Sequence, residues 1–151
     1  MKIVFTGGGT GGHFYPIIAI AQMVGKIIDR ERIIGAKLYY FSDNPFDKEL
    51  LSENVLLFEG ISAGKRRTYS SLSSFLLNFS DLFKSFFGVL NALYKLFSIY
   101  PDVVFGKGGY ASFPTIFAAR VLRIPVVIHE SDCAPGRVNL WAGRFAKKVA
   151  I

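Results

Sequence analysis

Short apolar segments alternate with longer segments of helical periodicity along the whole chain, and this alternation constrains the fold more than any other feature. It is typical of a parallel sheet with helices on both faces, the α/β class. The predicted strands are Lys2–Thr6, Lys37–Phe41, Val55–Phe58, Asp102–Phe105, Pro125–His129 and Lys148–Ile151. The predicted helices are Tyr15–Asp29, Asp47–Ser52, Ser71–Tyr100, Ser112–Leu122 and Arg137–Phe145.

The composition fits one folded domain with an anionic partner. The chain has 151 residues, of which 51% are apolar and 19% charged, and this balance excludes a disordered chain. A net charge of +7 favours nucleic acid, acidic lipid headgroups or phosphorylated substrates as partners. The single cysteine, Cys133, excludes an internal disulfide and fits a reducing compartment.

The two ends of the chain carry further expectations. The amino terminus shows no signal peptide, and no uninterrupted apolar run reaches the ~18 residues of a spanning helix, so we expect a cytosolic protein. The chain stops at Ile151, inside a predicted strand. We therefore expect it to be a piece of a longer protein; the alternative is a short terminal edge strand.

The segment Thr6–Pro16, which reads TGGGTGGHFYP, joins the first strand to the first helix. A glycine loop in this position turns backbone N–H groups and a positive helix end toward an anion. Gly7, Gly9 and Gly12 also satisfy the G-x-G-x-x-G spacing of dinucleotide-binding folds. The acidic residue that such folds place after the second strand is poorly matched, because Asp43 comes too late in the sequence.

His13 and Pro16 point to a reactive site at this loop. We expect Pro16 in the first helical turn, where proline is tolerated, and His13 at the mouth of the loop. The alternative is a histidine that caps the helix or braces the loop.

The second half of the chain repeats the pattern. Gly106–Pro114 is a second glycine loop after a predicted strand, and His129 and Glu130 end another. Both histidines of the chain thus fall beside the carboxyl end of a predicted strand. Because loops at one edge of a sheet form one site, we expect these segments to lie together.

Three motifs together resemble the MurG family of bacterial UDP-N-acetylglucosamine transferases. They are Gly8–His13, Gly108–Ser112, and His129-Glu130 with Asn139–Trp141 downstream. The resemblance covers essentially the whole chain. It implies a GT-B fold of two Rossmann-like domains, in which residues 1–151 form the amino-terminal, acceptor-binding domain and the carboxyl-terminal, donor-binding domain is absent.

The resemblance also implies an activity. N-acetylglucosamine would move from UDP-GlcNAc to the undecaprenyl-linked acceptor lipid I, with inversion at the anomeric carbon, to give lipid II for peptidoglycan. The enzyme would be a peripheral membrane protein at the cytoplasmic face of the plasma membrane. The family's chemistry needs no metal or cofactor and involves no nucleic acid.

Residue by residue, the resemblance assigns His13 to catalysis. The donor would contact Thr10, Gly11, Gly12 and Asp132. The acceptor would contact Gly108, Gly109, Tyr110, Ser112, His129 and Glu130. The chain departs from the family at Ser131 and Asp132, where an asparagine is typical; an ionised aspartate only accepts hydrogen bonds and would repel a phosphate-rich donor.

The predicted helix Ser71–Tyr100 carries more apolar surface than a helix covering a sheet requires. Its apolar residues form a stripe about 180° wide, with Ser80, Lys84, Asn91 and Lys95 opposite. We expect a membrane-surface patch of Phe75, Phe79, Phe83, Phe86 and Phe87, flanked by the basic Lys65, Arg66 and Arg67. The alternative is that the stripe meets the sheet on one side and a missing domain or subunit on the other.

Two other functions stay open at this point. One is a dinucleotide-binding module. The other is a membrane-recruiting subunit of a split glycosyltransferase, which would complete its site with a second chain.

Overall fold

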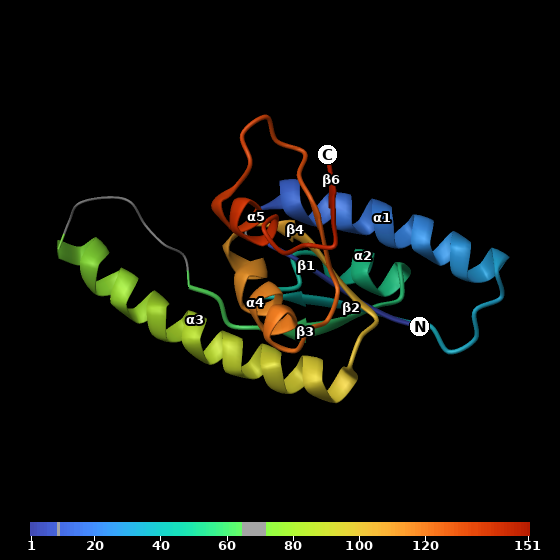
Figure 1. Ribbon diagram of the computed structural model, residues 1–151, viewed down its shortest axis with the longest axis horizontal. Helices are drawn as coiled ribbons and strands as arrows, with labels where there is room; N and C mark the ends of the chain where they lie inside the picture. Colours follow the sequence, from blue (N-terminus) through green and yellow to red (C-terminus); the bar gives the residue numbers. More distant parts are fainter. Residues whose placement is uncertain (9, 65–71) are drawn as a thin grey trace.

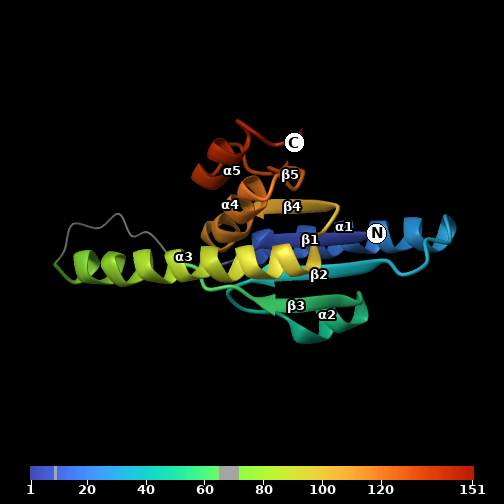
Figure 2. The same cartoon turned by 60° about the horizontal axis from the view of Figure 1, so that its bottom comes forward.

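Six parallel strands form one sheet in the computed structural model, which describes residues 1–8, 10–64 and 72–151. The strand order is β3-β2-β1-β4-β5-β6. Figure 2 shows β3, β2, β1, β4 and β5 in this order from bottom to top. The strands are β1 (Lys2–Gly7), β2 (Lys37–Ser42), β3 (Leu56–Gly60), β4 (Val103–Gly108), β5 (Val126–His129) and β6 (Lys148–Ala150). The predicted strands and the α/β class are therefore confirmed, with small shifts at the ends.

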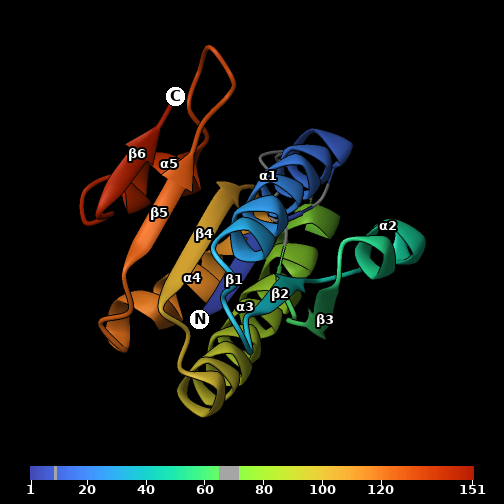
Figure 3. The same ribbon diagram turned by 90° about the vertical axis from the view of Figure 1, so that its right-hand side faces the viewer.

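Helices cover both faces of the sheet (Figure 1). They are α1 (Gly11–Arg30), α2 (Lys48–Glu53), α3 (Leu72–Ile99), α4 (Phe113–Val121) and α5 (Arg137–Ala142), with a short 3-10 turn, η1 (Tyr110–Ser112), before α4. Figure 3 shows α1 on one side of the strands and α3 and α4 on the other.

Two hydrophobic cores lie on opposite faces of the sheet. Val4 points into the core beneath α3, α4 and α5, whereas its neighbour Phe5 points into the core beneath α1 and α2. Both residues are essentially fully buried. A strand buried on both faces needs apolar residues throughout, which explains why the central strands show continuous apolar runs instead of alternation.

The strand order places a switch point at the centre of the sheet. The chain moves from β1 to β2 and β3 on one side, and then to β4, β5 and β6 on the other. In open α/β sheets, ligands bind outside the carboxyl ends of the strands at this point. Both glycine loops begin here, one after β1 and one at the end of β4.

The first helix begins earlier than its sequence pattern predicts. Thr10 is the extended N-cap residue, and its carbonyl oxygen accepts hydrogen bonds from the backbone N–H groups of His13 and Phe14. Gly11, Gly12 and His13 therefore form the first helical turn, and Pro16 is the sixth helical residue. The prediction that Pro16 lies in the first turn was wrong; being inside the helix, Pro16 provides no N–H for the Gly12 carbonyl.

Helix α3 contacts the domain through one narrow strip of its surface. Its amino-terminal part extends beyond the sheet (Figure 1). Ala92 and Leu96 are fully buried in the core. Two of the polar side chains opposite the apolar stripe contact the sheet: Lys95 pairs with Glu59 of β3, and the Asn91 amide donates to the Gly60 carbonyl at 3.3 Å.

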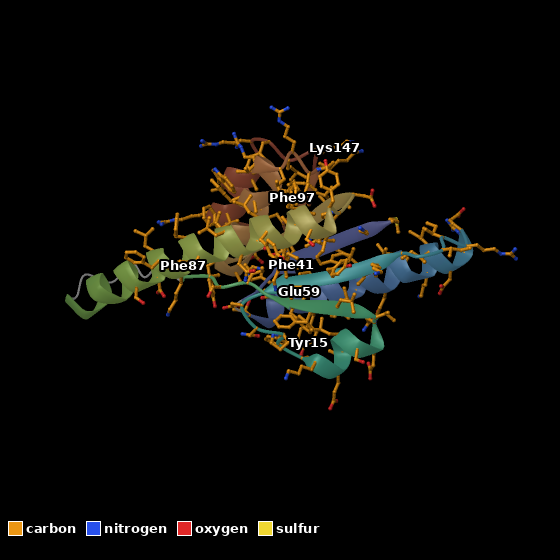
Figure 4. All side chains as sticks on the ribbon, turned by 90° about the horizontal axis from the view of Figure 1, so that it is seen from below. Tyr15, Phe41, Glu59, Phe87, Phe97 and Lys147 are labelled. Carbon is orange, nitrogen blue, oxygen red and sulfur yellow. The ribbon has the colours of Figure 1, made fainter. Side chains whose placement is uncertain are left out.

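The apolar stripe of α3 consequently faces solvent. Phe83, Phe86 and Phe87 are between 50% and 61% exposed, and Tyr94 and Phe97 are at least 70% exposed. Figure 4 shows Phe97 where α3 crosses the sheet and Phe87 nearer the extending end. The other expected patch residues, Lys65, Arg66 and Arg67 and the side chains of Phe75 and Phe79, lie outside the described residues.

As expected, no uninterrupted apolar run in α3 reaches the length of a spanning helix, because Asp81, Lys84 and Lys95 interrupt it. Judged by length and mean composition alone, Ser80–Ile99 is nevertheless the one helix among the described residues that is long and apolar enough to cross a membrane. Although charged residues interrupt this segment, its mean hydropathy is still high enough to meet this criterion. Only 17% of the segment is buried, so it is not an ordinary core helix.

We predict that the two sides of α3 differ sharply in their contribution to stability. Leu96→Ala should lower the free energy of unfolding by about 2–5 kcal/mol, the usual cost of a cavity in a core. Leu90→Ala is the matched control, because Leu90 is 47% exposed, and it should cost less than about 0.5 kcal/mol. Urea unfolding measures both; equal losses would show that α3 does not dock through the Leu96 side.

Candidate functional site

The two glycine loops touch at the carboxyl ends of β1 and β4. A Cβ atom on Gly109 would lie 2.5 Å from the Gly8 carbonyl oxygen and 2.9 Å from Cδ2 of His13. On Gly8, a Cβ atom would lie 2.9 Å from that of Ala111. Gly109 also has φ +81°, which side chains rarely adopt. Only glycine therefore permits this approach, and it places His13 directly against the second loop.

His13 is half-buried in the first turn of α1, and its Nδ1 atom is buried with no hydrogen-bond partner in the described part of the chain. Burial lowers the pKa of His13, and the positive charge of Lys107 lowers it further, while Asp132 and Glu130 act in the opposite direction. The imidazole is therefore neutral near pH 7 and can accept a proton.

His129 ends β5, and its ring stacks on Phe105 of β4 with 6.3 Å between centroids. Its Nδ1 atom is also buried and has no partner among the described residues. Burial and Lys107 lower the pKa of His129, against the effect of Glu130. Both histidines are thus neutral groups near the same buried lysine.

The expected donor residues next to His13 are open to solvent. Thr10 and Gly12 are exposed, and a Cβ atom on Gly12 would have Thr10 Oγ1, at 3.7 Å, as its nearest neighbour. Neither Gly11 nor Gly12 has a positive φ, so the backbone conformation at these positions does not itself require glycine. At Gly11 the space is limited by Tyr15 and Phe46.

Glu130 uses its carboxylate to hold the loop between β5 and α5. It accepts four hydrogen bonds, from the backbone N–H groups of Ser131, Asp132 and Gly136 and from the Asn139 side chain, at 2.9–3.1 Å. Burial alone would raise the pKa of Glu130, but these bonds outweigh it and lower the pKa to about 2. The geometry gives Glu130 a positioning role; direct contact with an acceptor stays a prediction.

Asn139 completes this support from α5. Its amide also donates to the His129 carbonyl at 3.2 Å, and a Cβ atom on Gly108 would lie 2.9 Å from its Nδ2 and Oδ1 atoms. Asn139 therefore joins the loop after β5 to the second glycine loop. Asp132 is exposed on that loop.

Two expected acceptor residues make bonds within the domain. The Tyr110 hydroxyl donates to Asp43 at 2.6 Å, and burial together with this bond raises the pKa of Tyr110 to about 12. The Ser112 hydroxyl is buried and donates to the Gly109 carbonyl at 2.8 Å. Because Asp43 at the end of β2 is engaged by Tyr110, it does not offer a free carboxylate for a dinucleotide ribose.

Lys107 is the site residue that sequence reasoning missed. It is 1% exposed, and its Nζ atom lies 3.0 Å from Ser131 Oγ. The available signal was a lysine between two glycines at the end of an apolar strand. Among the described residues, no group of three or more His, Cys, Asp or Glu side chains is placed to hold a metal ion.

Comparisons with known proteins agree with this geometry. The glycosyltransferase family 28 N-terminal domain matches residues 3–151. A Legionella pneumophila protein named UDP-N-acetylglucosamine--N-acetylmuramyl-(pentapeptide) pyrophosphoryl-undecaprenol N-acetylglucosamine transferase is 40% identical over 99% of this chain. A Clostridium botulinum protein of the same name is 37% identical over the same share. The chain spans 39% of the length of each.

Solved structures show the same fold. The crystal structure of MurG from Acinetobacter baumannii superposes with a TM-score of 0.73 at 27% identity, covering 98% of this chain and 40% of that one. HepE from Anabaena, in complex with UDP and glucose, superposes with a TM-score of 0.56 at 19% identity, over 99% of this chain and 37% of that one, and shows the fold alone. The Rossmann-like half of a GT-B fold and the family resemblance are thereby confirmed: the chain belongs to the glycosyltransferase family 28 N-terminal domain family.

Proposed function

We propose that this chain is the acceptor-binding domain of an inverting transferase that moves N-acetylglucosamine from UDP-GlcNAc to lipid I, forming lipid II. The names of the relatives identify the substrates that this proposal uses. The observation that carries the proposal is the placement of His13: a neutral, half-buried imidazole held against the second glycine loop at the switch point of the sheet.

In this proposal the two loops bind the acceptor's pyrophosphate and hold the base that accepts its proton. Backbone amides of Gly108–Tyr110 and the amino-terminal end of α1 face the acceptor's pyrophosphate, since helix ends and glycine loops favour anions. His13 accepts the proton of the acceptor's 4-hydroxyl group. The hydroxyl oxygen bonds to the anomeric carbon as the carbon–oxygen bond to UDP breaks, and the bonding electron pair leaves with UDP. One displacement inverts the anomeric centre.

The donor would be held mainly outside this chain. Because the chain spans 39% of its relatives, we propose that a carboxyl-terminal domain supplies most UDP contacts, with Thr10, Gly11 and Gly12 lining the cleft. The open surroundings of Thr10 and Gly12 leave room for a ligand. A second chain could supply that domain equally well, as in a split enzyme. Positioning of donor against acceptor needs both domains, so this chain alone would be inactive.

We further propose that the stripe of α3, defined here as Leu82, Phe83, Phe86, Phe87, Leu90, Tyr94 and Phe97, rests on an anionic membrane. These seven apolar side chains are 47–74% exposed on one side of the helix. Peripheral binding fits better than spanning, because Ala92, Leu96 and Lys95 hold the opposite side on the domain. The acceptor is lipid-linked, and the protein carries a net charge of +7. These features support a site at the cytoplasmic face of the plasma membrane.

His13→Ala in the full-length enzyme tests the proposed chemistry. We expect kcat for lipid II formation to fall by roughly 10²–10⁴, the usual contribution of a positioned base. The free energy of unfolding should fall by no more than about 1 kcal/mol, as for a residue outside the core.

His129→Ala is the matched control, and it should raise KM for the acceptor as much as it lowers kcat. If His13 only braces the loop, His13→Ala will melt earlier and keep its kcat. Retained kcat would therefore rule out His13 as the base.

Phe83→Asp combined with Phe87→Asp tests the membrane surface. The chain should bind vesicles containing anionic lipid, more weakly as salt rises, and the double variant should stay unbound because its apolar contact is lost. Ile34→Asp with Val55→Asp is the control, since both residues are exposed and apolar but lie outside α3. Vesicle flotation by the Phe83/Phe87 variant would assign the stripe to a protein interface instead.

A further inference from the structure

Asp43, the residue after β2, is tied to the second glycine loop by a hydrogen bond across the edge of the sheet. The Tyr110 hydroxyl donates to Asp43 Oδ2 at 2.6 Å, within the short range of hydrogen bonds from a hydroxyl group to a carboxylate. Because β1 lies between β2 and β4, the Tyr110 side chain spans the end of β1 to reach Asp43. The bond therefore joins the ends of two strands that do not pair with each other.

The first glycine loop lies next to this link. A Cβ atom on Gly8 would lie 2.5 Å from Ser42 Oγ, 2.9 Å from Cβ of Ala111 and 3.3 Å from Asp43 Oδ1. Gly8 is thus in close contact with both the end of β2 and the turn that carries Tyr110. Asp43 consequently lies beside one glycine loop and is bonded to the other.

The second loop needs such support, because glycine gives its backbone unusual freedom. Gly108 and Gly109 have φ values of +97° and +81°, and glycine adopts positive and negative φ about equally readily. Asn139 of α5, which follows β5, closely approaches Gly108, whereas Asp43 holds Tyr110 from the side of β2. The loop is therefore held from both directions along the sheet.

We propose that Asp43 is a positioning residue that, by accepting the hydrogen bond of the Tyr110 hydroxyl, holds the two glycine loops in the arrangement that binds the acceptor's pyrophosphate. The inference rests on the proposed function for the identity of that ligand. A carboxylate only accepts hydrogen bonds and would repel a pyrophosphate, so Asp43 acts through Tyr110 and not by contact with the acceptor. Burial and this bond raise the pKa of Tyr110 to about 12, so its hydroxyl keeps the proton that it donates.

Backbone amide NMR of the 151-residue chain tests the link without any substrate. Asp43→Ala removes the acceptor of the bond, and Tyr110→Phe removes its donor while keeping the ring. We expect both variants to move the amide signals of Gly8 and Gly109 in the same way, and the double variant to add no further change. Asp47→Ala is the matched control, because Asp47 caps α2 from the same loop; it should leave both glycine signals in place.

The same variants in the full-length enzyme test the role in binding. Loss of the bond should raise KM for lipid I roughly 10-fold, the usual worth of a hydrogen bond to a carboxylate. The value of kcat should fall less, because the pyrophosphate takes no part in bond breaking. The double variant should raise KM no further than either single one. Asp43→Asn keeps an oxygen acceptor and should raise KM less than Asp43→Ala, and Asp47→Ala should leave KM unchanged.

Three results would contradict parts of this account. Unmoved glycine signals in the folded variants would overturn the inference and leave the proposed function intact; Tyr110→Phe decides this alone if Asp43→Ala folds poorly. Additive effects of the two substitutions on KM would also overturn it, because the residues would then act independently. Glycine signals that move together while KM for lipid I stays unchanged would confirm the link, overturn its role in binding, and contradict an acceptor placed at these loops.

Discussion

The site depends on one steric constraint, the contact between two backbone loops that leaves no space for a Cβ atom. Gly109 lies against the Gly8 carbonyl and the His13 ring, and Gly108 lies against Asn139. These contacts join β1, β4, β5 and α5 at one edge of the sheet. They fix the imidazole of His13 beside backbone amides that can bind an anion. Glycine is thus required at Gly8 and Gly109 for the approach of the two loops.

Charged side chains from the loop after β5 and from the end of β4 surround this contact. The Glu130 carboxylate is saturated by hydrogen bonds and fixes the loop that carries Asp132. Lys107 is buried near the end of β4, and its charge lowers the pKa of both His13 and His129. On the other face of the sheet, α3 turns its aromatic side chains outward. One domain therefore carries both the exposed apolar side of α3 and the two glycine loops.

Much of the fold could be predicted from the sequence, because strands buried on both faces leave continuous apolar runs. Both glycine loops and both histidines were located by their position after such runs. The start of α1 was missed because helical geometry at Gly11 and Gly12 is set by the Thr10 cap, against glycine's low helix propensity. The docked side of α3 was missed because small residues form the contact while the large apolar residues face outward. Ala92 is fully buried, and a Cβ atom on Gly88 would lie 1.7 Å from the Ser62 carbonyl oxygen. Lys107 was missed because it forms a bulge in β4: Thr6 pairs with Gly106 and Gly7 pairs with Gly108, so Lys107 has no partner in β1. Such a bulge depends on the pairing with the neighbouring strand, which the sequence of β4 alone does not show.

The most direct test of the loop contact is Gly109→Ala, followed by urea unfolding and the NMR signals of the His13 imidazole. The added methyl group would collide with the Gly8 carbonyl at a φ of +81°, so we predict a loss of about 2–4 kcal/mol and a clear change in the His13 signals. Gly136→Ala is the matched control, because a Cβ atom there meets nothing within 4 Å. A Gly109→Ala protein with unchanged stability and unchanged His13 signals would contradict a site built on this contact.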